Sequence, residues 1–240
     1  MHTHRAARLG TTIGCLLVLV TGSGLISVPA SRASVPPEAA RAARAAVPAL
    51  IPGVTAGGVF LTGHDPDYHA VAGPDQAGAK DLIQKAVSYV TFAAAAPRML
   101  LVTHRTGPTP SADYADPALG MEAAGYSFDI ADDGTAGGSV LNLATVNFEN
   151  YDVIVVASDH GGWLTQGELT ILDARAAELV TFVNSGGGIV AFAESGDLAG
   201  SAGLTTGGQF GFLPYVVSSA TLNEPEAGNT VTPFGASIGV

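Results

Sequence analysis

Cysteine and basic residues are scarce in this chain of 240 residues. Cys15 is the only cysteine, and ten Lys and Arg stand against 21 Asp and Glu, which gives a net charge of −11. A single cysteine excludes an intramolecular disulfide and a thiolate-rich metal site. A surface this acidic repels phosphates, so nucleic acid and anionic lipid surfaces are excluded as partners.

Long apolar runs are missing beyond the first 33 residues. Residues 1–33 combine a basic start, an apolar stretch and small residues, the order that is typical of a secretory signal peptide cleaved after Ala33 or Ala30. Cleavage would remove Cys15 and three arginines, and would leave seven basic residues against 21 acidic ones, a net charge of −14. We therefore expect a secreted, extracellular protein that has no membrane segment after signal cleavage.

The remainder reads as a spacer followed by one domain. Residues 34–56 are rich in Ala and Pro and are typical of a spacer. Residues 57–240, in a chain that is 47% hydrophobic, are enough for a single domain with a sizeable core. The final stretch, "NTVTPFGASIGV", is apolar and has no capping signal, so either a last strand ends there or the chain is truncated. We favour truncation.

Apolar runs and helical patterns alternate between residues 57 and 195. Strands are expected at 57–63, 98–105, 126–134, 151–162 and 189–195, and helices at 77–93, 115–125 and 164–188. Asp116 and Pro117 are typical of a helix start, and Thr165 with Glu168 forms the pattern of a capping box. The alternation predicts a flavodoxin-like α/β fold: a mostly parallel sheet of five strands or slightly more, with helices on both faces.

Polar side chains follow the predicted strands, and all four histidines beyond residue 33 are among them. They are His64, Asp65, Asp67 and His69 after the first strand, His104 after the second, Asp159 and His160 after the fourth, and Glu194 and Ser195 after the fifth. Because ligands bind at the carboxyl edge of such sheets, we expect one shared polar site. The alternative is that these are ordinary loop residues.

The expected roles are divided between chemistry and binding. We assign the catalytic candidates as His64, Asp65, Asp159, His160 and Glu194, and the ligand-binding candidates as Asp67, His69, His104 and Ser195. Histidine and carboxylate donors from two or three loops could also hold a divalent metal. The spacing matches neither HExxH nor an EF-hand, so no metal ligand is assigned and no cofactor is established.

The stretch from Tyr151 to Ser195, "YDVIVVASDHGGW…FVNSGGGIVAFAES", resembles trehalose-utilisation-like domains of the class I glutamine amidotransferase-like superfamily. The segment "GVFLTGHDPDYH" resembles part of exported bacterial proteins without an assigned function. The resemblance implies a flavodoxin-like fold, a pocket at the sharp turn (the elbow) that follows the fifth strand, and a function connected with carbohydrates. Amidotransferases carry a cysteine at this elbow, and Glu194–Ser195 stands there in this chain, so glutamine hydrolysis through a thioester is excluded.

Two functions remain open. The missing elbow nucleophile favours a non-catalytic module that binds a carbohydrate or another small polar ligand. The alternative is an extracellular hydrolase, metal-assisted or not, that acts on a sugar or a related polar molecule. In that case His64 or His160 serves as general base and Asp65 or Asp159 orients it. The sequence does not predict the oligomeric state.

Overall fold

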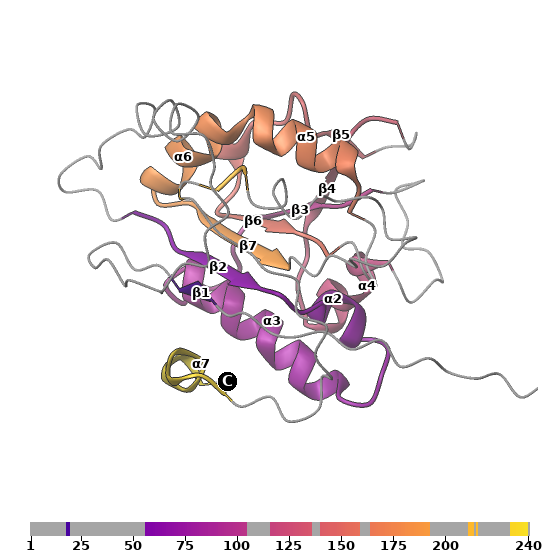
Figure 1. The fold of residues 1–240 in the computed structure, drawn as a ribbon, viewed down its shortest axis with the longest axis vertical. Coiled ribbons are helices and arrows are strands. Elements are labelled where there is room, and N and C mark those ends of the chain that lie inside the picture. The colour runs from indigo at the N-terminus through magenta and orange to yellow at the C-terminus, as the bar shows by residue number, and fades with distance from the viewer. Residues whose placement is uncertain are drawn as a thin grey trace, which may run out of the picture.

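The protein folds around a parallel sheet (Figure 1). The computed structural model describes residues 18–19, 56–104, 116–135, 140–158, 164–192, 211–213, 215 and 231–239. The strand order is β1-β2-β7-β6-β3-β4-β5. The parallel strands are β2 (Val59–Thr62), β7 (Gly188–Phe192), β6 (Val153–Val156), β3 (Met99–Val102), β4 (Asp129–Asp132) and β5 (Leu141–Asn142). At the edge, β1 (Val18–Leu19) pairs with β2 in the antiparallel direction.

Helices cover both faces of the sheet. In Figure 1, α5 and α6 lie over one face, whereas α3 lies against the other. The bounds are α2 Pro66–His69, α3 Gln76–Val90, α4 Pro117–Ala123, η1 Phe148–Asn150, α5 Gln166–Ala174, α6 Ala176–Asn184 and α7 Pro233–Ile238. Within the ranges given above, no helix is long and apolar enough to cross a membrane. The predicted flavodoxin-like α/β fold is confirmed, with six parallel strands because the two-residue β5 adds one.

The four central strands form the core because their residues are apolar on both faces. Every residue of β2, β3, β6 and β7 is buried. Such all-apolar strands are expected where helices cover both faces of a parallel sheet. Phe60 of β2 also contacts the ring of Phe234 in α7, which in turn packs edge-on against Tyr89 of α3. The segment near the C-terminus is thus a helix, and not the last strand that was one of the two alternatives for it.

The order of the strands creates a switch point between β3 and β6. From β3 the chain adds β4 and β5 on one side, and it then returns to add β6 and β7 on the other. The connections that follow β3 and β6 therefore lead away from each other. In open α/β sheets this divergence leaves a crevice at the carboxyl ends of the strands, where ligands bind.

The helix expected at 164–188 is interrupted at Arg175. This residue has φ −101° and ψ 14°, so α5 ends and α6 begins there. Its guanidinium donates a hydrogen bond to the carbonyl of Val146 over 2.7 Å and lies 3.8 Å from the centre of the Phe148 ring. These contacts hold Arg175 toward the segment after β5. The sequence has no Gly or Pro at this point to predict the break.

The predicted helix starts are confirmed. The Asp116 side chain accepts a hydrogen bond from the amide of Ala118 at the start of α4. At the start of α5, Thr165 accepts from the amide of Gly167, and the Glu168 carboxylate accepts from the amide of Thr165 over 2.9 Å. These bonds satisfy amides that a helix start would otherwise leave unpaired.

Replacing Thr165 tests the capping box. We expect Thr165→Ala to lower the free energy of unfolding by about 1 kcal/mol, the usual cost of losing an N-cap. Thr165→Ser keeps the capping hydroxyl and should retain most of the stability of the parent protein. Thr170→Ala is the matched control, because the hydrogen bonds of the Thr170 hydroxyl among the described residues are to Gln166, on the exposed side of α5. Urea unfolding of the three variants measures the effect. Equal stability of Thr165→Ala and Thr170→Ala would show that the box is not needed.

Candidate functional site

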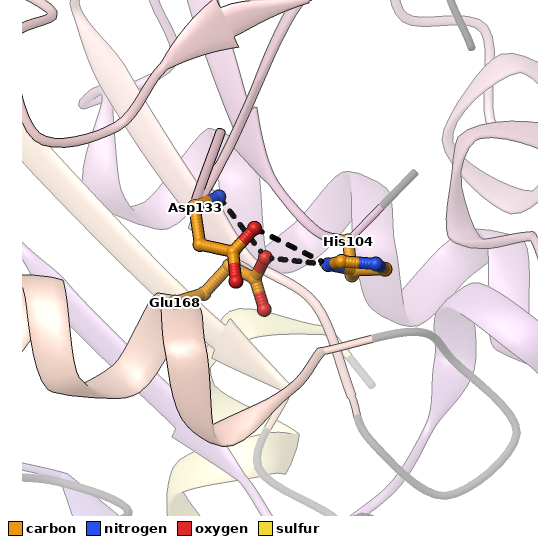
Figure 2. A group of neighbouring side chains, drawn as sticks. All are labelled: His104, Asp133 and Glu168. Carbon is orange, nitrogen blue, oxygen red and sulfur yellow. Dashed lines mark hydrogen bonds and ion pairs between the residues drawn. The ribbon is translucent and has the colours of Figure 1, made fainter. Parts of the chain in front are cut away.

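The switch point brings together His104, Asp133 and Glu168 (Figure 2). His104 follows β3, Asp133 directly follows β4, and Glu168 lies in the first turn of α5. The Nδ1 atom of His104 is 3.0 Å from Oε1 of Glu168 and 3.6 Å from Oδ1 of Asp133. One donor atom from each residue lies within 4.8 Å of the others, so the three residues could hold a metal ion.

The carboxylate of Glu168 is wholly buried and has four hydrogen-bond contacts. Oε1 meets Nδ1 of His104 and accepts from the amide of Asp133 over 3.1 Å. Oε2 accepts from both the amide and the hydroxyl of Thr165. A carboxylate has about four acceptor positions, so these contacts occupy all of them. Within the described part of the chain, the buried charge is compensated by hydrogen bonds rather than by a Lys or Arg.

Asp133 is held in its ionised form beside His104. Burial acts to raise the pKa of its carboxyl, but the hydrogen bonds from Thr135 and the neighbouring His104 outweigh burial, and the net pKa is lowered. The Thr135 hydroxyl and amide donate to Oδ1 over 2.7 and 2.9 Å. Oδ2 lies against Gly167, where a Cβ would be only 2.2 Å away. Glycine at this position of α5 gives the carboxylate its space.

A third carboxyl, that of Asp132, is buried close to this group. Its Oδ1 accepts from the amide of Gly134 over 2.7 Å, and its Oδ2 has no hydrogen-bond partner in the described structure. Burial, followed by the charges of Asp133 and Glu168, raises the pKa of Asp132. Among the described residues, no Lys or Arg forms an ion pair with Asp132, Asp133 or Glu168. Among the described residues, the site therefore combines three carboxyl groups with one imidazole.

Asp67 forms a separate buried contact at the end of β6. Its two oxygens accept from the amide and the hydroxyl of Ser158 over 2.9 and 2.8 Å, and both residues are fully buried. The backbone of α2 at Asp67 packs directly on Gly120 of α4, where a Cβ would lie 1.9 Å from the Asp67 carbonyl. Burial is the main cause that raises the pKa of Asp67 to about 7.

His64 and Asp65 directly precede α2, and His69 is its last residue. Nε2 of His69 is 3.1 Å from Oδ1 of Asp65, whose side chain is buried. His64 and His69 both line a pocket of about 280 Å³, whose other wall is the start of α3 at Asp75. This pocket is a second polar feature, distinct from the group around His104.

The candidate residues that the structure describes form three groups of contacts. His104 joins Asp133 and Glu168, and Asp67 joins Ser158. His64 and His69 line the pocket at α3, and Asp65 pairs with His69. The remaining candidates, Asp159, His160, Glu194 and Ser195, lie outside the described residues. Their roles stay predictions, as does their meeting in one crevice.

Sequence reasoning missed Asp133 and Glu168 as site residues. Asp133 stands in the run "DIADDG", where two carboxylates follow the third strand just as polar residues follow the others. The position of these carboxylates at the end of a predicted strand could have indicated Asp133 as a site residue. Glu168 was recognised only as part of a capping box, and nothing in its spacing indicates that the same carboxylate also reaches His104.

Comparison with protein-family models, with curated proteins and with solved structures finds no match for this chain. The resemblance to trehalose-utilisation-like domains therefore stays a prediction. The function has to be argued from the site itself.

Asp67 makes the stability depend on pH. The carboxyl has a pKa of about 7 in the folded protein against 3.8 for its ordinary value, so between these values the folded state holds a proton that the unfolded state has lost. The contribution of Asp67 is fully present below pH 3.8 and is lost as the pH rises to about 7, with a slope of at most about 1.4 kcal/mol per pH unit.

Asp67→Asn, which cannot ionise, should remove this slope. Urea unfolding at several pH values between 4 and 8 measures it, and Asp81→Asn on the exposed side of α3 is the charge-matched control. We expect the control to follow the parent protein and Asp67→Asn to be flatter than both. The same pH dependence in all three proteins would contradict a protonated Asp67.

Proposed function

We propose that this protein is a hydrolase in which His104 acts as the general base and Glu168 orients it. The observation that supports this proposal is the 3.0 Å contact between Nδ1 of His104 and the buried Oε1 of Glu168. Figure 2 shows one imidazole nitrogen turned toward the carboxylates and the other turned away from them. The side chain of His104 is 28% exposed, so this second nitrogen can meet a small molecule.

The hydrogen bond determines which nitrogen can take a proton. An ionised carboxylate only accepts hydrogen bonds, so Nδ1 must carry the proton that points at Glu168. In the neutral imidazole Nε2 is then unprotonated and can remove a proton from water. The water oxygen forms a bond to the electrophilic carbon, and the bond to the leaving group breaks. The proton taken by Nε2 passes to the departing atom, which restores the neutral imidazole.

The neighbouring charges support this step. Water attack makes His104 an imidazolium, and both Glu168 and Asp133 lie within 3.6 Å of its Nδ1. Two negative charges at this distance stabilise the cation as it forms. The same charges repel an anionic substrate. We therefore propose a neutral or cationic polar substrate, such as a sugar derivative, and disfavour phosphate esters.

A metal centre is the second candidate, and the three donor atoms within 4.8 Å favour it. Imidazole with two carboxylates is a suitable donor set for zinc or another divalent ion. However, a metal on Nδ1 requires that nitrogen to be unprotonated, and Glu168 would have to exchange one of its four hydrogen-bond contacts for the ion. For this reason we prefer the metal-free pair of His104 and Glu168.

The non-catalytic binding module is less well supported by this geometry. A capping box alone explains why Glu168 bonds Thr165, but it does not require the same carboxylate to hold an imidazole nitrogen. The fixed tautomer also leaves Nε2 unprotonated, as a general base requires. These two points lead us to prefer the enzyme, which the sequence alone left as the alternative.

A substrate screen tests the proposal. The purified chain is assayed with chromogenic neutral glycosides and carboxylic esters and with phosphate monoesters, in the presence and absence of EDTA. We expect turnover of a neutral substrate that EDTA does not change. His104→Gln should lower kcat by about 10²- to 10⁴-fold, the usual contribution of a general base, and should leave KM nearly unchanged.

Two further variants make the result specific. Glu168→Gln keeps the size of the side chain but removes its charge, and we expect it to lower kcat and to shift the pH profile. Lys85→Gln is the control, because the ion-pair partner of Lys85 within the described residues is Asp81, on the same helix α3. Full activity in His104→Gln would overturn the proposal. Loss of activity in EDTA that zinc restores would instead establish the metal centre.

A further inference from the structure

A second, larger pocket lies at the opposite edge of the sheet. It has a volume of about 820 Å³ and is built from the segment that connects α3 to β3, the segment that leads into β4, and Tyr151 just before β6. These are the amino ends of the strands, so β3 and β4 separate this pocket from His104 and Asp133. The volume is in the range of pockets that hold small molecules.

Arg98 supplies the positive charge of this pocket. Its guanidinium lies 5.7 Å from the centre of the Tyr151 ring, and its backbone amide donates to Asp152 over 2.8 Å. No Asp or Glu of the described residues forms an ion pair with Arg98. A guanidinium that is stacked on a ring and has no carboxylate partner keeps its paired N–H donors for a ligand, and these donors match the geometry of a carboxylate.

Asp129 supplies a negative charge in the same pocket. The Tyr151 hydroxyl donates to its Oδ2 over 2.9 Å, which orients the carboxylate and leaves Oδ1 for another donor. Burial of Tyr151, followed by this hydrogen bond, raises the pKa of the phenol to about 12, so the hydroxyl remains a donor. Tyr151 thus contacts both charged groups, which do not pair with each other.

The wall of the pocket has an unusual backbone. Phe92, Ala93 and Ala96 have φ values of 52°, 62° and 53°, although none of them is glycine. Ala93 and Ala96 line the pocket, and Phe92 is 63% exposed. Side chains other than glycine rarely adopt this left-handed region, and where they do, the strained segment is often part of a ligand site.

From these observations we infer that the pocket of Arg98, Asp129 and Tyr151 binds a free amino acid. Arg98 takes the α-carboxylate, Asp129 takes the α-ammonium group, and the pocket between them takes the side chain. The net charge of −11 supports a ligand of this kind, because a simple anion would be repelled by the protein as a whole. A zwitterion has no net charge, and each of its ends meets an opposite charge.

The test uses L-phenylalanine with two compounds that each lack one charge. N-acetyl-L-phenylalanine has no ammonium group, and L-phenylalaninamide has no carboxylate. The full-length chain, labelled with ¹⁵N, is titrated with each compound up to about 10 mM and then with each of the remaining natural amino acids. The backbone amide signals of Tyr126, Ser127 and Asp129 are followed in every titration. We expect saturable shifts for at least one amino acid, and binding of its two single-charge analogues that is at least about tenfold weaker.

Variants locate the two contacts. Arg98→Gln should bind the free amino acid no more tightly than its amide, which lacks the carboxylate. Asp129→Asn should bind the free amino acid no more tightly than its N-acetyl derivative, which lacks the ammonium group. Lys85→Gln and Asp81→Asn remove the same charges from the exposed side of α3 and should bind like the parent. Arg98 and Asp129 are exposed, so neither change should unfold the domain, and urea unfolding checks this.

Three outcomes would overturn the inference. The first is no saturable shift with any of the amino acids. The second is equal binding of the N-acetyl compound, which would describe an anion site. The third is equal binding by the parent and by both pocket variants, which would place any bound amino acid elsewhere.

Discussion

The buried carboxylate of Glu168 is the interaction on which the site depends. It joins three segments that are distant in the sequence: the end of β3 through His104, the end of β4 through the amide of Asp133, and the start of α5 through Thr165. An unpaired buried charge would be strongly destabilising, so each of these donors is needed. The bond that closes the helix start therefore also sets the position of the imidazole.

The fold provides the place where such a carboxylate can act. Because β3 and β6 are neighbours while their connections diverge, the ends of β3 and β4 and the first turn of α5 meet at one edge of the sheet. Three carboxylates gather there without a Lys or Arg partner among the described residues. Hydrogen bonds compensate the charges of Glu168 and Asp133, and both carboxylates lie close enough to Nδ1 of His104 to stabilise the positive charge that forms when the imidazole takes a proton.

The sequence predicted what depends on local patterns. The all-apolar strands, the helix starts at Asp116 and Thr165 and the parallel sheet follow from periodicity and capping. The break at Arg175 and the partner of His104 could not be predicted, since both depend on contacts between segments far apart in the chain. The sequence predicted His104 as a residue of this edge of the sheet, but it did not predict Asp133 and Glu168 beside it. The single shared site stays a prediction.

The protonation of His104 tests the account most directly. A two-bond ¹H–¹⁵N spectrum of the histidine rings, assigned with His104→Gln and recorded where the imidazole is neutral, distinguishes its two tautomers. We predict the proton on Nδ1, because only an N–H can bond to the Glu168 carboxylate. A proton on Nε2 would contradict the account, since the nitrogen that faces Glu168 would then be an acceptor, as a metal ligand is.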